Sequence, residues 1–276
     1  MEWYTHLCEY YNVSPEEALR LGTRSSGRKP NLPGSSTCDP VIGMTYEDIW
    51  DQKERNTVEE VFQFYKDQGA WSAFRQVVRH KDMVGLHMSY INFLISNGGI
   101  RPGSHICEYG AGVAPFVTTI LSLLDENSKD VNMKFTVVDV DCEHLNFAKY
   151  RLNAIKEERN MKNIELFFET VEPDKLPSFS SNLDSIFCFE VLEHVPSPLA
   201  VLENFNNNLN SGGFYIENFI KHETEEDDPP GPDLESAKNE RDQYYENLKN
   251  NFYLIHPDSV EKIDRFPNET RIWQKV

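Results

Sequence analysis

After Gly103 the chain alternates short apolar runs with amphipathic segments, and this alternation limits the possible folds more than any other feature. Apolar runs of this length predict buried strands, and the amphipathic segments between them predict helices. Strands that alternate with helices form right-handed crossovers and a mainly parallel sheet with helices on both faces. The predicted strands span residues 105–108, 134–139, 164–168, 183–189 and 214–219, and the predicted helices span residues 114–124, 143–157 and 198–209.

The C-terminal part of the chain has a different pattern. A helix is predicted over residues 234–250, and two further strands over 252–255 and 270–275, which gives seven strands in total. We therefore expect an α/β protein with a doubly wound, mainly parallel seven-stranded sheet. Ligands bind such sheets outside the carboxyl ends of the strands, so we expect the functional residues at that edge.

The first hundred residues carry helical spacing and no strand signal. Ser14 is an N-cap residue, followed by Pro15 at the first helical position. We expect a helical N-terminal cap or lid over residues 1–100 and a ligand-binding domain over residues 101–276. The helices predicted in the cap run from Ser14 to about residue 21, over residues 46–66 and over residues 83–96, with a Gly-, Pro- and Ser-rich loop over residues 23–43.

Charge and composition exclude several classes of protein. The chain has 27 Lys and Arg against 45 Asp and Glu, a formal net charge of −18, and it shows no basic patch with which to neutralise phosphates. No stretch approaches the roughly 18 apolar residues of a membrane span, and the start of the chain does not resemble a signal peptide. The five cysteines form no Cys-x-x-Cys pair. We expect a cytoplasmic protein without a nucleic-acid or membrane partner.

A glycine-rich turn follows the first predicted strand. From Glu108 it reads Glu-Tyr-Gly-Ala-Gly-Val-Ala, with Gly110, Ala111 and Gly112 at the turn. Glycine lets a backbone turn tightly and approach a ligand closely. The next predicted strand ends at Asp139, whose carboxylate can accept hydrogen bonds from both hydroxyls of a ribose. Together they predict a nucleoside site; the alternatives are a turn that serves only packing and a solvated carboxylate.

Four blocks in this order, residues 108–114, 137–141, 183–196 and 209–214, resemble the conserved blocks of class I S-adenosylmethionine-dependent methyltransferases. The chain is most similar to the ubiquinone-type O-methyltransferases and related small-molecule enzymes, whose fourth strand also leads into a Glu-Val-Leu-Glu-His-Val segment. The resemblance implies a Rossmann-like methyltransferase fold and S-adenosylmethionine as cofactor. Ala114 stands where the family has its third loop glycine.

The resemblance also implies how the cofactor is held. The loop approaches its amino-acid end and sulfonium, Asp139 its ribose, and Val171 or Glu172 its adenine. Because Pro115 interrupts a Gly-x-Gly-x-x-Gly pattern, a nicotinamide-dependent dehydrogenase is disfavoured. The candidate cofactor-binding residues are Glu108, Gly110, Ala111, Gly112, Asp139, Val140, Val171, Glu172, Glu190, Arg75 and Arg79.

Beyond the fourth predicted strand lies a Glu-x-x-Glu-His motif formed by Glu190, Glu193 and His194. By resemblance this motif ligates a divalent metal in ubiquinone-type O-methyltransferases and in small-RNA 2′-O-methyltransferases, where a further histidine completes the site; His222 lies in the matching region. Two carboxylates and imidazoles suit Mg²⁺, Mn²⁺, Fe²⁺ or Zn²⁺. The alternative is the metal-free arrangement of many relatives, in which the Glu-His pair packs near the cofactor. Glu193 and His194 are also catalytic candidates.

The segment from Gly69 to His80 combines aromatic residues with Arg75 and Arg79. It suggests a lid in which one arginine binds the cofactor's carboxylate through its planar fork. His80 or His87 is a candidate general base, because an imidazole titrates near neutral pH. For each of these residues the alternative is a structural role or a surface ion pair.

The sequence therefore predicts a methyltransferase that acts on an oxygen or nitrogen of a small-molecule acceptor, as a monomer or homodimer. One alternative is a non-catalytic S-adenosylmethionine-binding partner subunit, and another is a metal-dependent RNA 2′-O-methyltransferase, which the charge disfavours. The acidic run over residues 223–233 is either a solvated loop or a flap that favours a cationic substrate.

Overall fold

A seven-stranded sheet in the order β3-β2-β1-β4-β5-β7-β6 forms the centre of the molecule in a computed structural model. The structure describes residues 4–22, 57–67, 69–124, 131–173, 175–180, 182–219, 234–256 and 270–276. The strands β1 to β5 are parallel to one another, and β7 is antiparallel to both of its neighbours. The strands are β1 (His105–Tyr109), β2 (Met133–Val140), β3 (Ile164–Val171), β4 (Leu183–Cys188), β5 (Leu209–Glu217), β6 (Phe252–His256) and β7 (Arg271–Lys275).

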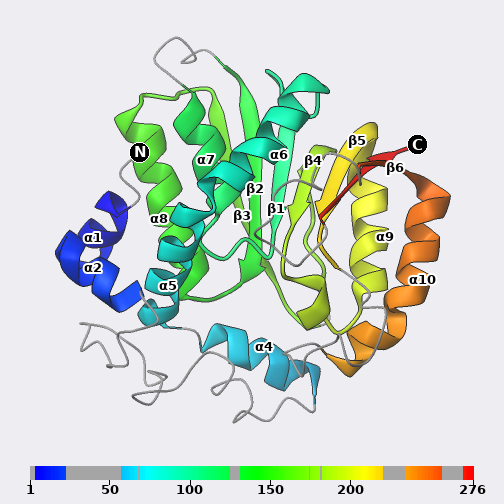
Figure 1. The fold of residues 1–276 in the computed structure, drawn as a ribbon, viewed down its shortest axis with the longest axis horizontal. Coiled ribbons are helices and arrows are strands. Elements are labelled where there is room, and N and C mark those ends of the chain that lie inside the picture. Colours follow the sequence, from blue (N-terminus) through cyan, green and yellow to red (C-terminus); the bar gives the residue numbers. More distant parts are fainter. Residues whose placement is uncertain are drawn as a thin grey trace.

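The inner strands are apolar because helices cover both faces of the sheet. All five residues of β1 are buried, and β4 is buried except for Asp184. In Figure 1, α7 and α8 lie on one side of the strands, and α9 and α10 lie on the other. The helices are α1 (Thr5–Tyr11), α2 (Pro15–Gly22), α4 (Val58–Lys66), α5 (Ala70–Asp82), α6 (Val84–Ser96), α7 (Pro115–Leu123), α8 (Glu143–Glu158), α9 (Pro198–Asn208) and α10 (Glu235–Asn251), with a 3₁₀ turn η3 (Leu192–His194).

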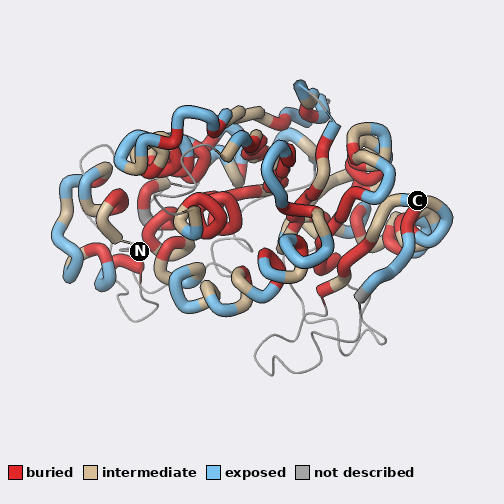
Figure 2. The backbone as a smooth tube through the Cα atoms, turned by 90° about the horizontal axis from the view of Figure 1, so that it is seen from above, coloured by how far each residue is buried: buried red, intermediate tan, exposed pale blue. Residues whose placement is uncertain are grey.

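The N-terminal helices share a hydrophobic core with the sheet domain. Leu7 and Tyr11 of α1 and Phe74 of α5 pack in one buried cluster with Val113 of the glycine-rich turn and Phe147 of α8. Figure 2 shows buried segments through the middle of the molecule and exposed ones around its rim. The cap is therefore packed directly onto the loop in which we expect the cofactor to bind.

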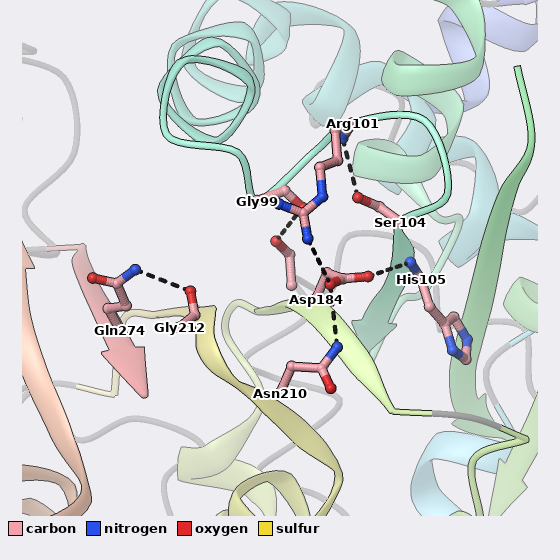
Figure 3. A network of polar contacts seen from close by, with 9 residues as sticks. Gly99, Arg101, Ser104, His105, Asp184, Asn210, Gly212 and Gln274 are labelled. Atoms are coloured by element: carbon pink, nitrogen blue, oxygen red, sulfur yellow. Dashed lines mark hydrogen bonds and ion pairs between the residues drawn. The ribbon is translucent and has the colours of Figure 1, made fainter. Parts of the chain in front are cut away.

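Asp184, at the start of β4, joins the amino ends of three strands (Figure 3). Its Oδ2 accepts the backbone N–H of His105 at 2.8 Å, and its Oδ1 accepts the amide of Asn210 at 3.2 Å. Arg101 lies 3.8 Å from the same carboxylate. The next residue, Ser185, donates its hydroxyl to the carbonyl of Gly99 at 2.8 Å. These contacts fix the edge of the sheet opposite the carboxyl ends.

The predicted fold is confirmed: all seven predicted strands are present in one mainly parallel, doubly wound sheet. The fifth strand begins at Leu209 instead of residue 214, because buried Leu209 already pairs with Leu183 before a register shift. Helices α1 and α5 were not predicted. Residues 23–56, which contain the predicted loop and the start of the second predicted cap helix, lie outside the described residues, as does the acidic run 223–233.

Among the helices of the described residues, none combines the length and the apolar character needed to cross a membrane.

Candidate functional site

The turn between β1 and α7 lies at the carboxyl edge of the sheet. Three of its residues have left-handed backbones, with φ of 64° at Gly110, 53° at Gly112 and 51° at Ala114. An added Cβ at Gly110 would lie 2.2 Å from the side chain of Val191, in the segment after β4. Glycine is therefore required at this position by both conformation and space. Ala114 adopts the left-handed conformation at some cost, directly before Pro115 begins α7.

Asp139, at the end of β2, holds this turn. Its Oδ2 accepts the backbone N–H of Gly112 at 2.5 Å, and its Oδ1 accepts the N–H of Val140 at 2.7 Å. Burial raises the pKa of Asp139 to about 6, although these two hydrogen bonds lower it. Each carboxylate oxygen has a second lone pair. Asp139 can thus accept ribose hydroxyls while it fixes the loop.

Glu108 has a different environment from the one expected of a ligand-binding residue. It is buried, and its two oxygens accept the backbone N–H groups of Phe116 at 3.1 Å and Val117 at 2.9 Å, in the first turn of α7. Burial raises the pKa of Glu108 to about 8, against the effect of these hydrogen bonds. The structure places it as the acceptor for the N-terminus of α7, beneath the loop.

The residues proposed for the adenine lie at the carboxyl end of β3. Val171 is buried and pairs in register with Val140, the residue after Asp139. Glu172 is exposed and forms an isolated bridge with Lys175. Apolar Val171 and Val140 thus form adjacent positions on the same edge as Asp139, as a flat base requires.

The turn after β4 brings Glu190 to the same edge. Its backbone has a φ of 55°, and its N–H donates to Oδ1 of Asn218, after β5, at 2.8 Å. The amide of Asn218 donates in turn to Oε1 of Glu190, and Arg79 of α5 lies 4.0 Å from Oε2. Backbone strain of this kind is concentrated at functional sites. Glu190 therefore links the ends of β4 and β5 with α5.

Glu193 and His194 form a half-buried pair in η3. His194 Nε2 lies 3.7 Å from Glu193 Oε1, and the ring of Tyr65, from α4, lies 6.0 Å from the imidazole. The carbonyl of Glu193 accepts the N–H of Leu234 at 2.8 Å, just before α10 begins. A carboxylate beside an imidazole stabilises its protonated form. This pair can accept a proton from a bound acceptor.

The predicted metal ligands do not assemble within the described part of the chain. No group of three or more His, Cys, Asp and Glu side chains there is arranged to hold an ion. Glu190 is directed to Asn218 and Arg79, whereas Glu193 and His194 contact each other. His222 lies outside the described residues.

Helix α5 covers the glycine-rich turn, as a lid would. Arg79 reaches Glu190, and Arg75 is half-buried on the same helix. Gln76 of α5 contacts the loop directly, because its Oε1 accepts the N–H of Val113 at 3.2 Å. Sequence reasoning missed Gln76, and it also missed its second contact, His144 at the start of α8. Gln76 could have been found from the helical spacing of Ala70, Ala73, Phe74 and Val77. This spacing predicts a helix and places residue 76 near its buried face.

The two candidate general bases on α5 and α6 are in unsuitable surroundings. The rings of His80 and His87 lie 5.4 Å apart, and His87 packs 4.5 Å from the ring of Phe116. Burial lowers the pKa of His87 to about 4 and that of His80 well below its ordinary value, with the charges of His87 and Arg79 contributing to the latter. Imidazoles with such pKa values are weak bases, so we assign proton transfer to neither.

Residues 107–215 match a family model described as a methyltransferase domain. No curated protein matches the chain. Solved structures with a similar fold include an rRNA methylase from Streptococcus thermophilus, at 14% identity over 69% of this chain and 96% of that one, with a TM-score of 0.42. A putative methyltransferase from Bacillus halodurans is 13% identical over 61% and 71% of the two chains, with a TM-score of 0.42. Coclaurine N-methyltransferase is 14% identical over 48% and 35%, with a TM-score of 0.35.

Residues 107–215, which match the family model, contain most of the candidate site. This segment runs from the glycine-rich turn through Asp139 and the Glu193–His194 pair into β5. The chain thus contains a methyltransferase domain of the class that uses S-adenosylmethionine as its methyl donor.

Proposed function

We propose that this chain transfers the methyl group of S-adenosylmethionine to an oxygen or nitrogen of a small-molecule acceptor. The observation that carries the proposal is a convergence at the carboxyl edge of the sheet. The loop held by Asp139 and the Glu193–His194 pair both follow adjacent, central strands, β1 and β4. A donor on the first and an acceptor beside the second would lie next to each other.

The chain's own residues supply the donor site. Asp139 accepts the ribose hydroxyls, Gly110 and Gly112 give close approach to the backbone, and Val140 with Val171 offers an apolar surface for the base. Bound there, S-adenosylmethionine supplies an electrophilic methyl group on a sulfonium. The remaining task of the protein is to orient the acceptor and to exclude water.

His194 is proposed as the general base. A lone pair of the acceptor oxygen or nitrogen forms the new bond to the methyl carbon as the carbon–sulfur bond breaks, and the bonding electrons remain on sulfur. The acceptor's proton passes to the imidazole of His194, and Glu193, 3.7 Å away, stabilises the resulting charge. Tyr65 from α4 borders the imidazole.

The net charge of −18 supports a small molecule over RNA as the acceptor. The sequence resemblance to the ubiquinone-type branch favours the same class. Glu190, after β4, and Arg79 of α5 form an ion pair that offers an acceptor both a carboxylate and a guanidinium.

The test is production of S-adenosylhomocysteine from S-adenosylmethionine in the presence of fractionated small-molecule extracts, with a purified short-RNA pool in parallel. We expect turnover with at least one small-molecule fraction. His194→Ala should lower kcat by about a hundredfold or more at unchanged S-adenosylhomocysteine affinity, which is the usual effect of losing a general base. His6→Gln is the matched control, because His6 lies on α1 and pairs with Glu158.

Two results would overturn the proposal. Turnover with RNA alone would show that the acceptor class is wrong. Binding of S-adenosylmethionine without turnover in any fraction would favour the non-catalytic partner subunit. Full activity of the His194→Ala variant would remove His194 from the chemistry and leave the methyl transfer itself intact.

A further inference from the structure

Two side chains, from opposite sides, hold successive N–H groups of the glycine-rich turn. Asp139 of β2 accepts the N–H of Gly112 at 2.5 Å, and Gln76 of α5 accepts the N–H of Val113 at 3.2 Å. The N–H of Ala111 donates to the carbonyl of Val138, and the N–H of Ala114 donates to the carbonyl of Ala111 within the turn. The conformation of the turn therefore depends on one residue of the sheet and one of the lid.

The orientation of the Gln76 amide is fixed by this contact. The N–H of Val113 is a donor, so it must face the amide oxygen, and Nε2 must then point the other way. There it lies 3.5 Å from Nδ1 of His144, at the start of α8. Burial lowers the pKa of His144 to about 4, so the ring is neutral near pH 7 and its Nδ1 can accept from the amide.

The fit between Gln76 and the turn is close. A Cβ added to Gly112 would lie 2.3 Å from Oε1 of Gln76, so this glycine leaves the space that the amide occupies. One helical turn further along α5, Arg79 reaches Glu190 after β4. Helix α5 thus contacts the segments that follow both β1 and β4.

We propose that Gln76 is a positioning residue of the donor site, which holds the glycine-rich turn in its ligand-binding conformation and links it to helix α5. The proposal rests on the proposed function, because the turn is the site of S-adenosylmethionine. Gln76 acts through Val113 and His144. Loss of its acceptor oxygen leaves the Val113 N–H without its side-chain partner and removes this polar link between α5 and the turn.

The test measures S-adenosylhomocysteine affinity by calorimetry and backbone amide exchange by mass spectrometry for the wild type, Gln76→Leu and Gln76→Glu. The leucine variant loses the acceptor, so its Kd should rise about five- to tenfold. The glutamate variant keeps an acceptor for Val113 but loses the donor to His144, so it should recover part of the affinity that the leucine variant loses. Gln63→Leu is the matched control, since Gln63 is an exposed residue of α4 that bonds only to Asp67 among the described contacts.

Amide exchange separates this proposal from the proposed function. In the wild type without ligand, the segment around Val113 and helix α5 should exchange slowly. Both should exchange faster in Gln76→Leu but not in Gln63→Leu. Thermal unfolding midpoints of all variants are measured in parallel. If the wild type binds no S-adenosylhomocysteine, the proposed function fails, yet the exchange result still tests the coupling. Unchanged affinity and exchange in Gln76→Leu, or equal losses in the leucine and glutamate variants, would overturn the role of Gln76. Should Gln76→Leu not fold, Gln76→Glu and Gln76→Asn allow the same comparison of acceptor reach.

Discussion

At Gly110, both the backbone conformation and the neighbouring side chain restrict which residue the position can hold. Its φ of 64° disfavours any L side chain, and a Cβ would lie 2.2 Å from Val191. The neighbour is the first side chain after Glu190, so displacing it would disturb the turn that carries the acceptor-side residues. The effect of a substitution should therefore extend from the donor loop to the far side of the site.

Gly110→Ala should lower S-adenosylmethionine affinity by more than tenfold and destabilise the fold by about 1–3 kcal/mol, from left-handed strain and overpacking. Gly103→Ala is the matched control, because Gly103 also has a positive φ, 91°, but no atom lies within 4 Å of its added Cβ. Calorimetry and urea unfolding measure both effects. Equal affinity losses in the two variants would show that contact with Val191 is unimportant.

At the scale of elements, α5, α6 and α7 enclose neutral histidines. His87 of α6 is buried against Phe116, and burial lowers its pKa to about 4. In the unfolded chain a histidine binds a proton below about pH 6.5. The folded protein binds that proton only near pH 4, so His87 costs stability as the pH falls between these values.

Between pH 6.5 and 4, the free energy of unfolding of the wild type should therefore fall relative to that of His87→Phe, by up to about 1.4 kcal/mol per pH unit. The raised pKa values of Glu108 and Asp139 act in the opposite direction, but both proteins share them and they cancel in the difference. Urea unfolding across this range gives the measurement. A difference that does not change with pH would mean that folding does not lower the pKa of His87.

Elements differ in how far the sequence predicts them. The strands β1, β2 and β4 were predictable because each is a short apolar run that the sheet buries on both faces. Helix α5 was not predicted. The arginines and aromatic residues of this segment were interpreted as ligand contacts, and their helical spacing was not used. Its key contact joins residues 37 apart in the chain, Gln76 and Val113. No local pattern specifies such a pair.

At the scale of the whole molecule, the order of the sheet places the site. Both β1 and β4 are central, and their carboxyl ends adjoin those of β2 and β5, so residues far apart in the chain meet at one edge. Topology was therefore enough to predict that Asp139, Gly110 and Glu193 belong to one region. It did not predict that Glu108 would hold the N-terminus of α7 or that Glu190 would turn to Asn218, because both depend on tertiary hydrogen bonds.

Calorimetry with S-adenosylmethionine and S-adenosylhomocysteine measures whether the loop held by Asp139 binds the methyl donor, as we propose. We expect both ligands to bind the wild type, and Asp139→Ala to weaken both by more than tenfold, about 1.4 kcal/mol, through loss of the ribose contacts and of the Gly112 hydrogen bond. Asp141→Ala, an exposed acid two residues further on, should bind as the wild type does. If the folded wild type binds neither ligand at millimolar concentration, the loop held by Asp139 is not a site for S-adenosylmethionine.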